Sequence, residues 1–220
     1  MRPHNTISKS ALVAAQPMQR HLKRVVDRTF GMAITLAVTP ILATAAGAIV
    51  AEGLARPPTR APILYREPRI SQGRVFGLLK FRTVEATAYR RAVATGNLRP
   101  LETPEHLTFV GKYLKRWYLD ELPQVLNIAR GEIGFVGTRP YPVPDYEAEL
   151  ARGEHRKRVI PAGLTGLTQI HKGRAGDRTD VDFDYEYYER YRSYSGPRLL
   201  LYDLSIVLRT VRTVFEGKGL

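Results

Sequence analysis

The chain has 220 residues, a formal net charge of +13 and no cysteine. Its length suits one domain with room for a small additional segment, and 44% apolar residues are enough for a hydrophobic core. The absence of cysteine excludes disulfides, thiolate metal sites and a cysteine nucleophile, while the positive charge favours an anionic partner: nucleic acid, anionic lipid or a phosphorylated substrate.

The N-terminal part of the chain changes abruptly in character. Residues 1–22 are polar without clear periodicity, so we expect a flexible leader. From Thr29 to Ala51 the chain carries no charged residue, and Lys23, Arg24 and Arg28 stand just before this stretch. As a straight helix the stretch would reach about 34 Å, close to the thickness of a bilayer core.

Three interpretations of this apolar stretch are open from its residues alone. Its length fits a helix that spans the membrane. Its basic flank and the small residues Ala43-Thr44-Ala45 fit a signal peptide, although the charged region would begin late. Pro40 lies in the middle and disfavours helix at Thr39, which fits a helix that breaks and re-enters one leaflet. Because proline is tolerated in straight membrane helices, it does not exclude the spanning helix.

The remainder of the chain predicts helices with a few short strands. After a turn-rich segment at 56–62, two strands are expected at 63–65 and 75–79, around a turn at Gly73, and residues 84–105 predict a helix and a loop. The further elements predicted, in chain order, are a basic amphipathic helix at 110–117, a helix at about 121–130 closed by Gly131, a charged helix at 145–158, a Gly- and Thr-rich loop at 161–169, a tyrosine-rich helix at 182–192 and an apolar helix at 198–215.

Two adjacent carboxylates stand at the predicted start of the helix at 121–130. On one helix, neighbouring residues point about 100° apart, so Asp120 and Glu121 cannot face each other from one stripe. We expect Asp120 as the N-cap, Glu121 as the first helical residue and Pro123 within the first turn. This arrangement fits a well-capped helix in which the two carboxylates have only a structural role. It also fits an ionised Asp120 that attacks phosphorus or holds a divalent cation at a helix N-terminus.

Three basic residues are candidates for binding that phosphate. Lys80 and Arg82 flank Phe81 at the end of the second predicted strand, and Arg139 precedes Pro140 at a rigid corner where it can chelate a phosphate at two points. Each residue also has a purely structural interpretation. Lys80 and Arg82 fit the solvated face of a strand, and Arg139 fits a surface turn.

Taken together, these segments resemble the bacterial sugar transferases of the monotopic phosphoglycosyl transferase superfamily, in order and through residues 23–220. Thr138 departs from the family pattern, because it stands where the family has the first proline of a Pro-Arg-Pro corner. The matching segments are Lys23-Arg24-x-x-Asp27, Thr39-Pro40, Lys80-Phe81-Arg82-Thr83, Leu119-Asp120-Glu121-Leu122-Pro123-Gln124 with Asn127, Gly131 and Glu132, Gly137-Thr138-Arg139-Pro140, Pro161-x-Gly163-Leu164-Thr165-Gly166-Leu167-x-Gln169, and Asp203-x-x-Ile206-x-x-x-Thr210.

The resemblance implies an enzyme that moves a sugar-1-phosphate from a nucleoside diphosphate sugar, usually a UDP-sugar, to undecaprenyl phosphate. UMP leaves, Mg²⁺ is required, and the product starts an exopolysaccharide, O-antigen or related glycan. The resemblance implies that Asp120 is the nucleophile, forms a phospho-sugar intermediate and contacts Mg²⁺, and that Glu121 assists it. The residues it assigns to the substrate phosphates are Lys80, Arg82, Arg139 and Asp203.

The resemblance also implies a monotopic membrane protein of the mostly α class. The leader at 1–22 would precede a re-entrant helix hairpin at 23–54, broken at its central proline, and a cytoplasmic catalytic domain at 55–220 with amphipathic interfacial helices at 110–117 and 198–215. Both ends would face the cytoplasm at the bacterial inner membrane. Membrane lipids and a second copy of the chain, in a homodimer, would be further partners, with no nucleic acid. The alternatives are a non-catalytic scaffold that binds polyprenyl phosphate, and a soluble nucleic-acid-binding protein.

Overall fold

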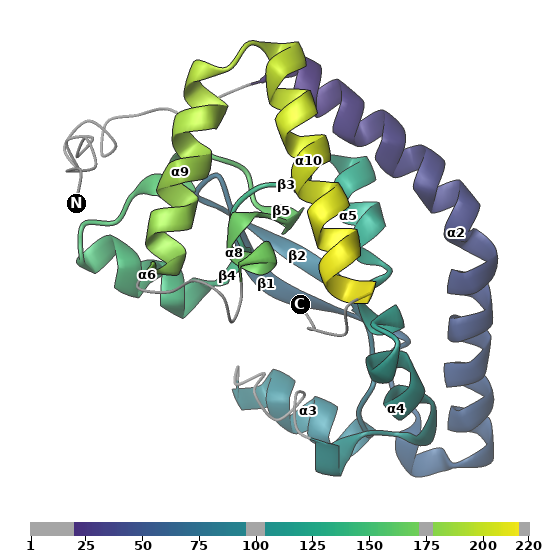
Figure 1. Cartoon of the computed structure of the whole chain (residues 1–220). Helices are drawn as coiled ribbons and strands as arrows, with labels where there is room; N and C mark the ends of the chain where they lie inside the picture. Colours follow the sequence, from purple (N-terminus) through teal and green to yellow (C-terminus); the bar gives the residue numbers. More distant parts are fainter. Residues whose placement is uncertain (1–19, 96–103, 172–177, 216–220) are drawn as a thin grey trace. The chain divides into compact units, whose positions relative to one another are not determined.

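The computed structural model describes residues 20–95, 104–171 and 178–215 (Figure 1). These residues are mostly helical with a few short strands, which confirms the predicted class. The predicted leader lies almost entirely outside the described residues. By its contacts the chain forms two compact units: unit 1 contains the chain up to Phe30, Pro68–Phe76 and Ile128–Leu220, and unit 2 contains Gly31–Glu67 and Gly77–Asn127.

The elements are numbered in chain order, and Figure 1 labels most of the helices and all the strands. The helices are α2 (His21–Ala55), α3 (Ala86–Thr95), α4 (Phe109–Arg116), α5 (Gln124–Arg130), α6 (Val143–Ala151), α7 (Arg156–Val159), α8 (Leu167–Ile170), α9 (Asp180–Ser193) and α10 (Gly196–Phe215), with short 3-10 turns η1 (Pro57–Thr59), η3 (Pro104–His106) and η4 (Leu119–Glu121). The strands are β1 (Leu64–Ser71), β2 (Arg74–Phe81), β3 (Gly134–Val136), β4 (Tyr141–Pro142) and β5 (Gly163–Thr165).

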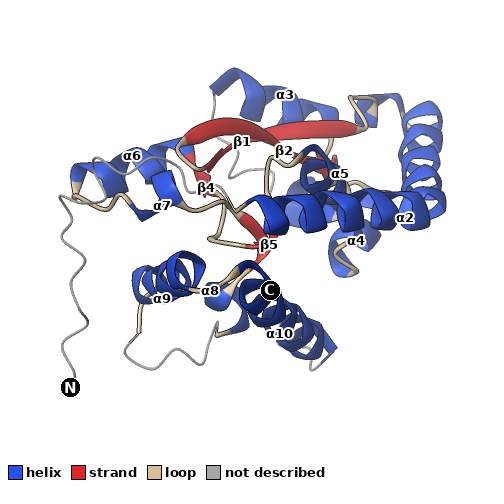
Figure 2. Cartoon of the chain, turned by 90° about the horizontal axis from the view of Figure 1, so that it is seen from above, coloured by secondary structure: helices blue, strands red, loops and turns tan. Residues whose placement is uncertain are grey.

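The strands form two small sheets. In the first, the order is β2-β1-β4, and β4 runs antiparallel to β1. The turn between β1 and β2 has positive φ at both Gln72 and Gly73, which is the backbone that a tight two-residue hairpin requires. In the second sheet β3 runs parallel to β5. Helices α8 and α10 pack on this pair, and α9 packs on α8 (Figure 2).

Most predicted elements are confirmed, and three are corrected, one of which is the helix predicted at about 121–130, which begins at Gln124. The charged helix predicted at 145–158 is interrupted near Gly153, so it forms the separate helices α6 and α7. The predicted loop at 161–169 contains strand β5 and the short helix α8, because its backbone pairs with β3.

Helix α2 is long and apolar enough to cross a membrane, and only 11% of its most apolar window is buried. A core helix of a soluble protein would be mostly buried, so this exposure supports membrane association. The helix is continuous through Pro40, and both views show it bent rather than straight (Figures 1 and 2). The hydroxyls of Thr35, Thr39 and Thr44 each donate to a carbonyl four residues earlier. Such bonds, together with the N–H that proline lacks, bend helices. A re-entrant hairpin stays a prediction.

The first turns of α2 are held in unit 1 by a buried charge cluster. Lys23 is 2% exposed, and its Nζ lies 2.6 Å from Asp203 Oδ2 and 3.0 Å from Asp27 Oδ2. The Tyr187 hydroxyl donates to the second oxygen of Asp203 at 3.1 Å. Two of the motifs found in the sequence, around residues 23–27 and at Asp203, therefore meet in one ion cluster that joins α2 to α10.

We predict that Lys23→Met lowers the free energy of unfolding by about 3–5 kcal/mol, because it leaves two buried carboxylates without their shared cation. Asp203→Asn should cost less, since Lys23 keeps Asp27 as a partner. Thermal or denaturant unfolding in detergent measures both, with the exposed Lys112→Met as the control. Equal, small effects of all three variants would contradict a stabilising role of the Lys23–Asp27–Asp203 cluster.

Candidate active site

The two predicted catalytic carboxylates lie in unit 2, against a lysine from the neighbouring hairpin. Asp120 is 8% exposed, whereas the Glu121 side chain is 44% exposed. Lys80 Nζ lies 3.3 Å from Glu121 Oε1 and also 3.3 Å from Oε2 of the buried Glu67. The structure thus brings Asp120, Glu121 and Lys80 together in unit 2 and adds Glu67 to them, while their catalytic and phosphate-binding roles stay predictions.

The backbone around Asp120 differs from the predicted helix start. Residues Leu119–Glu121 form the 3-10 turn η4, and α5 begins only at Gln124, so Asp120 is not the N-cap of α5. Successive backbone bonds, such as Leu122 N–H to the Leu119 carbonyl, span three residues. Because Pro123 offers no N–H, the chain forms tight turns up to this residue and becomes α-helical only after it. The carboxylate is therefore placed by a turn rather than by a helix N-terminus.

The residue before η4 has an uncommon backbone conformation. Tyr118 has φ 55° and ψ 20°, the left-handed region that residues with a side chain rarely occupy. Conformations of this kind cost free energy and cluster at functional sites. Here the left-handed residue turns the chain sharply between helix α4 and Asp120.

The pKa of Asp120 is raised from 3.8 to about 6, mainly because the carboxyl is buried and also because of the nearby negative charge of Glu121. The positive charges of Lys80 and Lys115 oppose this shift. At neutral pH Asp120 is therefore largely ionised, yet its charge is poorly compensated. Such a perturbed carboxyl beside a specific charged partner is typical of functional sites.

Helix α4, which leads into η4, is fixed by side-chain caps at its start. Thr108 accepts a hydrogen bond from the Gly111 N–H at 2.9 Å, and the Glu52 carboxylate accepts from the backbone of Phe109 at 2.7 Å and Val110 at 3.1 Å. Glu52 belongs to the end of α2. A carboxylate at a helix N-terminus is favourable, so the end of the long apolar helix is tied to the element that precedes the site.

Arg82 makes contacts of a different kind from Lys80. It is 2% exposed, and its guanidinium donates to the carbonyls of Pro62, at 3.0 Å, and Val84. Burial lowers its pKa. These bonds hold the backbone just before β1 and just after β2, and the phosphate contact expected of Arg82 stays a prediction.

Arg139 and Asp203 both belong to unit 1. Arg139 has an exposed side chain, and its carbonyl accepts a hydrogen bond from the buried Lys157 at 3.2 Å, which fixes the backbone of the Arg-Pro corner. Asp203 lies in the Lys23 cluster and shares its charge there. The phosphate role of Asp203 stays a prediction, but its contacts in the structure are those of an anchor for α2.

An apolar groove of about 510 Å³ lies in unit 2 beside the site. It is formed by the middle of α2, the start of β1, the end of β2 and the residues that follow η4. Pro123 and Leu126 line it and come just after Asp120 in the chain. The full lining is Thr39, Leu42, Ala43, Ala46, Pro62, Ile63, Leu64, Phe81, Pro123 and Leu126. A groove of this chemistry suits a hydrocarbon chain rather than a polar ligand.

The described residues contain no group of three or more His, Asp or Glu side chains that could hold a metal ion. This does not conflict with Mg²⁺, because Mg²⁺ is commonly held by one or two carboxylates together with substrate phosphates. Asp120 and its neighbours also leave an excess of negative charge, since Glu67, Asp120 and Glu121 surround Lys80. The donor set therefore fits a divalent cation that arrives with an anionic substrate.

Comparison with known proteins identifies relatives over nearly the whole chain. The sequence model of the family described as Bacterial sugar transferase matches residues 18–217. The Exopolysaccharide production protein ExoY of Sinorhizobium fredii is 32% identical over 94% of this chain and 91% of its own length. The UDP-glucose:undecaprenyl-phosphate glucose-1-phosphate transferase of Caulobacter vibrioides is 34% identical over 86% of this chain and 68% of its own length.

A third relative is much longer than this chain. The Galactosyl transferase CpsE of Streptococcus agalactiae is 33% identical over 72% of this chain, and the match spans only 36% of CpsE. The similarity to this relative therefore concerns a part of it.

We predict that Asp120→Asn stabilises the Mg²⁺-free protein. Because the pKa of Asp120 is raised in the folded state, the stability associated with this group is full below about pH 4 and is lost as the pH rises through about 6. At pH 7.5 the neutral amide should add up to about 3 kcal/mol to the free energy of unfolding, and near pH 4 it should add nothing. Unfolding in EDTA at both pH values measures this, with the exposed Asp145→Asn as the control. A gain that does not change with pH would contradict the assigned pKa.

Proposed function

Because the chain belongs to the bacterial sugar transferase family, we propose that it transfers a sugar-1-phosphate from a nucleoside diphosphate sugar to undecaprenyl phosphate. The relative from Caulobacter vibrioides, whose name gives this reaction for glucose, supports the acceptor and the class of donor. The observation that carries the proposal is the buried Asp120, raised in pKa and set beside Lys80 in the longest motif of the chain. The product would start an exopolysaccharide or a related glycan.

The chemistry divides into two displacements at phosphorus. In the first, a carboxylate oxygen of Asp120 attacks the β-phosphorus of the UDP-sugar, and the bond to the bridging oxygen breaks, so UMP leaves with that electron pair. In the second, a phosphate oxygen of undecaprenyl phosphate attacks the same phosphorus, and the Asp120 carboxylate is released. The product is an undecaprenyl diphospho-sugar. A covalent intermediate replaces one difficult step by two easier ones.

The charge balance of the site explains why a cation is expected. Three carboxylates, Glu67, Asp120 and Glu121, lie around Lys80, and an incoming diphosphate would add further negative charge. Asp120 with the donor phosphates would hold Mg²⁺, which supplies positive charge at the oxygens of the transferred phosphoryl group. Lys80, oriented from both sides by Glu67 and Glu121, would contribute a fixed positive charge.

Glu121 is suited to a positioning role. Its side chain is held by Lys80 at 3.3 Å and is more exposed than that of Asp120. Its negative charge helps to raise the pKa of Asp120, so it makes the neighbouring carboxylate more basic. A more basic carboxylate is a better nucleophile at phosphorus, provided that it stays ionised at the working pH.

The apolar surfaces support a lipid acceptor. The groove beside Asp120 would take the hydrocarbon chain of undecaprenyl phosphate next to its phosphate. Helix α4 exposes Phe109, Tyr113 and Trp117 at intervals of one turn, and its remaining exposed residues are basic. In unit 1, α10 exposes an apolar stripe of its own: Leu201, Leu204, Leu208 and Val211. Exposed stripes of this kind are typical of helices that lie in a membrane interface.

The membrane arrangement is part of the same proposal. Helix α2 would enter one leaflet of the inner membrane, bend near Pro40 and return, so that the catalytic residues stay on the cytoplasmic face. The basic residues before the apolar stretch support a cytoplasmic position for its start.

The reaction is tested by UMP release. With undecaprenyl phosphate, Mg²⁺ and a panel of UDP-sugars, the wild type should release UMP with at least one donor. Asp120→Asn should lower the rate by about 10³-fold or more, as loss of a nucleophile does, while Asp145→Asn should leave it unchanged. Without acceptor, a phospho-sugar adduct should appear on the peptide that contains Asp120 by mass spectrometry. Binding of the lipid without UMP release would favour the scaffold alternative, and an adduct on another residue would overturn the role of Asp120.

The bent insertion of α2 is tested by accessibility. We expect cysteines introduced near each end of the chain to react with a membrane-impermeant reagent only after the inner membrane is opened. An N-terminus that is labelled from the periplasm in the wild type would show a spanning helix instead.

A further inference from the structure

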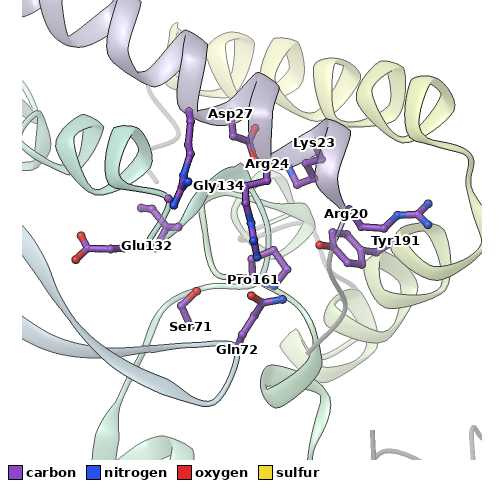
Figure 3. A pocket seen from close by; sticks show the side chains of 13 residues that line it. Arg20, Lys23, Arg24, Asp27, Ser71, Gln72, Glu132, Gly134, Pro161 and Tyr191 are labelled. Carbon is purple, nitrogen blue, oxygen red and sulfur yellow. Dashed lines mark ion pairs between the residues drawn. The ribbon is translucent and has the colours of Figure 1, made fainter. Parts of the chain in front are cut away.

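A second cluster of cations lies in unit 1, at the start of α2. It surrounds a cavity of about 40 Å³ that none of the proposed catalytic residues lines (Figure 3). The walls come from the first turns of α2, the β1–β2 turn, the segment after α5, Pro161 and Tyr191, all of which belong to unit 1. The cavity can therefore be described without reference to the carboxylate site.

The basic residues of α2 divide into two stripes by their spacing. Lys23 and Asp27 are four residues apart and point into the buried cluster with Asp203. Arg20, Arg24 and Arg28 are also four residues apart and therefore share a neighbouring stripe of the helix, which faces the cavity. Lys23 and Asp27 are paired with each other and also line part of the cavity, whereas the second stripe consists of cations only.

The arginines of the second stripe lack acidic partners. Among the described residues, none of Arg20, Arg24 and Arg28 forms an ion pair. Nη2 of Arg20 is buried without a hydrogen-bond partner in the described part of the chain. Arg28 donates to the Arg130 carbonyl at 2.9 Å through one of its several N–H groups. The Arg20 guanidinium lies 5.9 Å from the centre of the Tyr191 ring, but its buried nitrogen without a hydrogen-bond partner costs free energy, which an anionic ligand would recover.

The cavity also offers neutral donors opposite the arginines. Figure 3 shows the Arg24 side chain reaching from α2 towards the turn that carries Ser71 and Gln72, whereas the carboxylate of Glu132 is directed away from Arg24. The Ser71 oxygen accepts a hydrogen bond from the Ala162 N–H at 3.1 Å, so its own hydroxyl hydrogen is left to donate. The two sides of the cavity thus present a guanidinium and a hydroxyl to one small acceptor.

The size of the cavity limits the ligand. About 40 Å³ holds roughly three or four water molecules, which is close to the four oxygens of one phosphate group and far too little for a nucleoside. Arg28 is the last charged residue before the apolar stretch of α2, so a membrane that accepts α2 would bring its headgroups to this level. We propose that Arg24, with Arg20 and Ser71, binds the phosphate of an anionic phospholipid at this cavity. The membrane position rests on the proposed insertion of α2; the binding site itself does not depend on the transfer reaction.

The test measures lipid binding without any sugar donor. Purified protein in neutral detergent is titrated with short-chain phosphatidylglycerol, with short-chain phosphatidylcholine, and with inorganic phosphate, and the melting temperature is followed. We expect phosphatidylglycerol to raise the melting temperature and phosphatidylcholine to leave it unchanged. Arg24→Gln should weaken the apparent affinity for phosphatidylglycerol by about tenfold or more, the scale of a lost charged hydrogen bond. The affinity of Arg24→Lys for phosphatidylglycerol should lie between those of the wild type and Arg24→Gln, because lysine keeps the charge but not the two-pronged set of donors.

A matched control separates a site from general attraction. Arg209→Gln removes the same charge from an exposed position of α10 in the same unit and should change the affinity by less than about twofold, the scale of a screened surface charge. Equal losses in Arg24→Gln and Arg209→Gln would overturn the site. Stabilisation by inorganic phosphate without preference for phosphatidylglycerol would show a soluble ligand and overturn the lipid assignment. If neither lipid nor inorganic phosphate raised the melting temperature, both the phosphate site and its assignment to a lipid would be overturned.

Two further variants separate this site from a folding defect and from the transfer reaction. Arg20→Gln should also weaken binding, so a variant of Arg24 that fails to fold does not leave the proposal untested. Asp120→Asn should bind phosphatidylglycerol as the wild type does, since Asp120 is not part of the cavity. Loss of transfer activity and loss of this site are therefore distinguishable.

Discussion

The structure depends on charged contacts that fix both ends of an apolar helix. At its start, the buried Lys23 is shared by Asp27 and Asp203, and at its end Glu52 caps α4. Most of the apolar window of α2 is exposed and suited to lipid, and the helix packs in a hydrophobic core only near its end, where Ala45 and Ile49 contact Phe81 and Leu114. Buried ion pairs are costly to desolvate, but their geometry is specific. Here the Lys23 cluster fixes the start of α2 within unit 1, and the Glu52 carboxylate ties its end to α4 within unit 2.

The carboxylate site also has more carboxylates than cations, and there the charge of Asp120 has no ion pair of its own among those of the described residues. Asp120 is kept buried with a raised pKa, next to Glu121, and Lys80 is shared with Glu67. The resting protein therefore carries a charge that it does not fully compensate, and this lowers its stability at neutral pH. A site that must receive a cation and an anionic donor gains from such incomplete compensation, because the missing interactions are made only when they bind. Under the proposed reaction, stability and activity would be in direct competition at Asp120.

Much of this could be predicted from the sequence, and the exceptions have physical causes. The spacing of apolar residues and the turn residues are sufficient to predict α4, α9, α10 and the β1–β2 hairpin.

The helix start at Asp120 is predicted too early, because the 3-10 turn η4 has the same residue preferences as a helix N-terminus. Glu67 escapes the sequence argument, since only the pairing of β1 with β2 brings it to Lys80. The strand predicted at 63–65 ends before Glu67, whereas β1 in the structure continues to Ser71 and so includes it. Arg82 cannot be distinguished from Lys80 by spacing, because burial alone separates their contacts.

The Lys23-Arg24-x-x-Asp27 segment shows why adjacent residues of one motif need not share a role. A step of one residue along a helix turns the side chain by about 100°, so Lys23 and Arg24 face different surroundings. Lys23 faces two carboxylates and is satisfied inside the protein, whereas Arg24 faces a cavity with a hydroxyl and an amide. A pair of basic residues before an apolar helix is usually assigned to membrane topology alone. Membrane topology and phosphate binding place different requirements on this pair. A preference for the cytoplasmic side requires only positive charge. A cavity of phosphate size, by contrast, requires the Arg24 side chain at its own position on the helix.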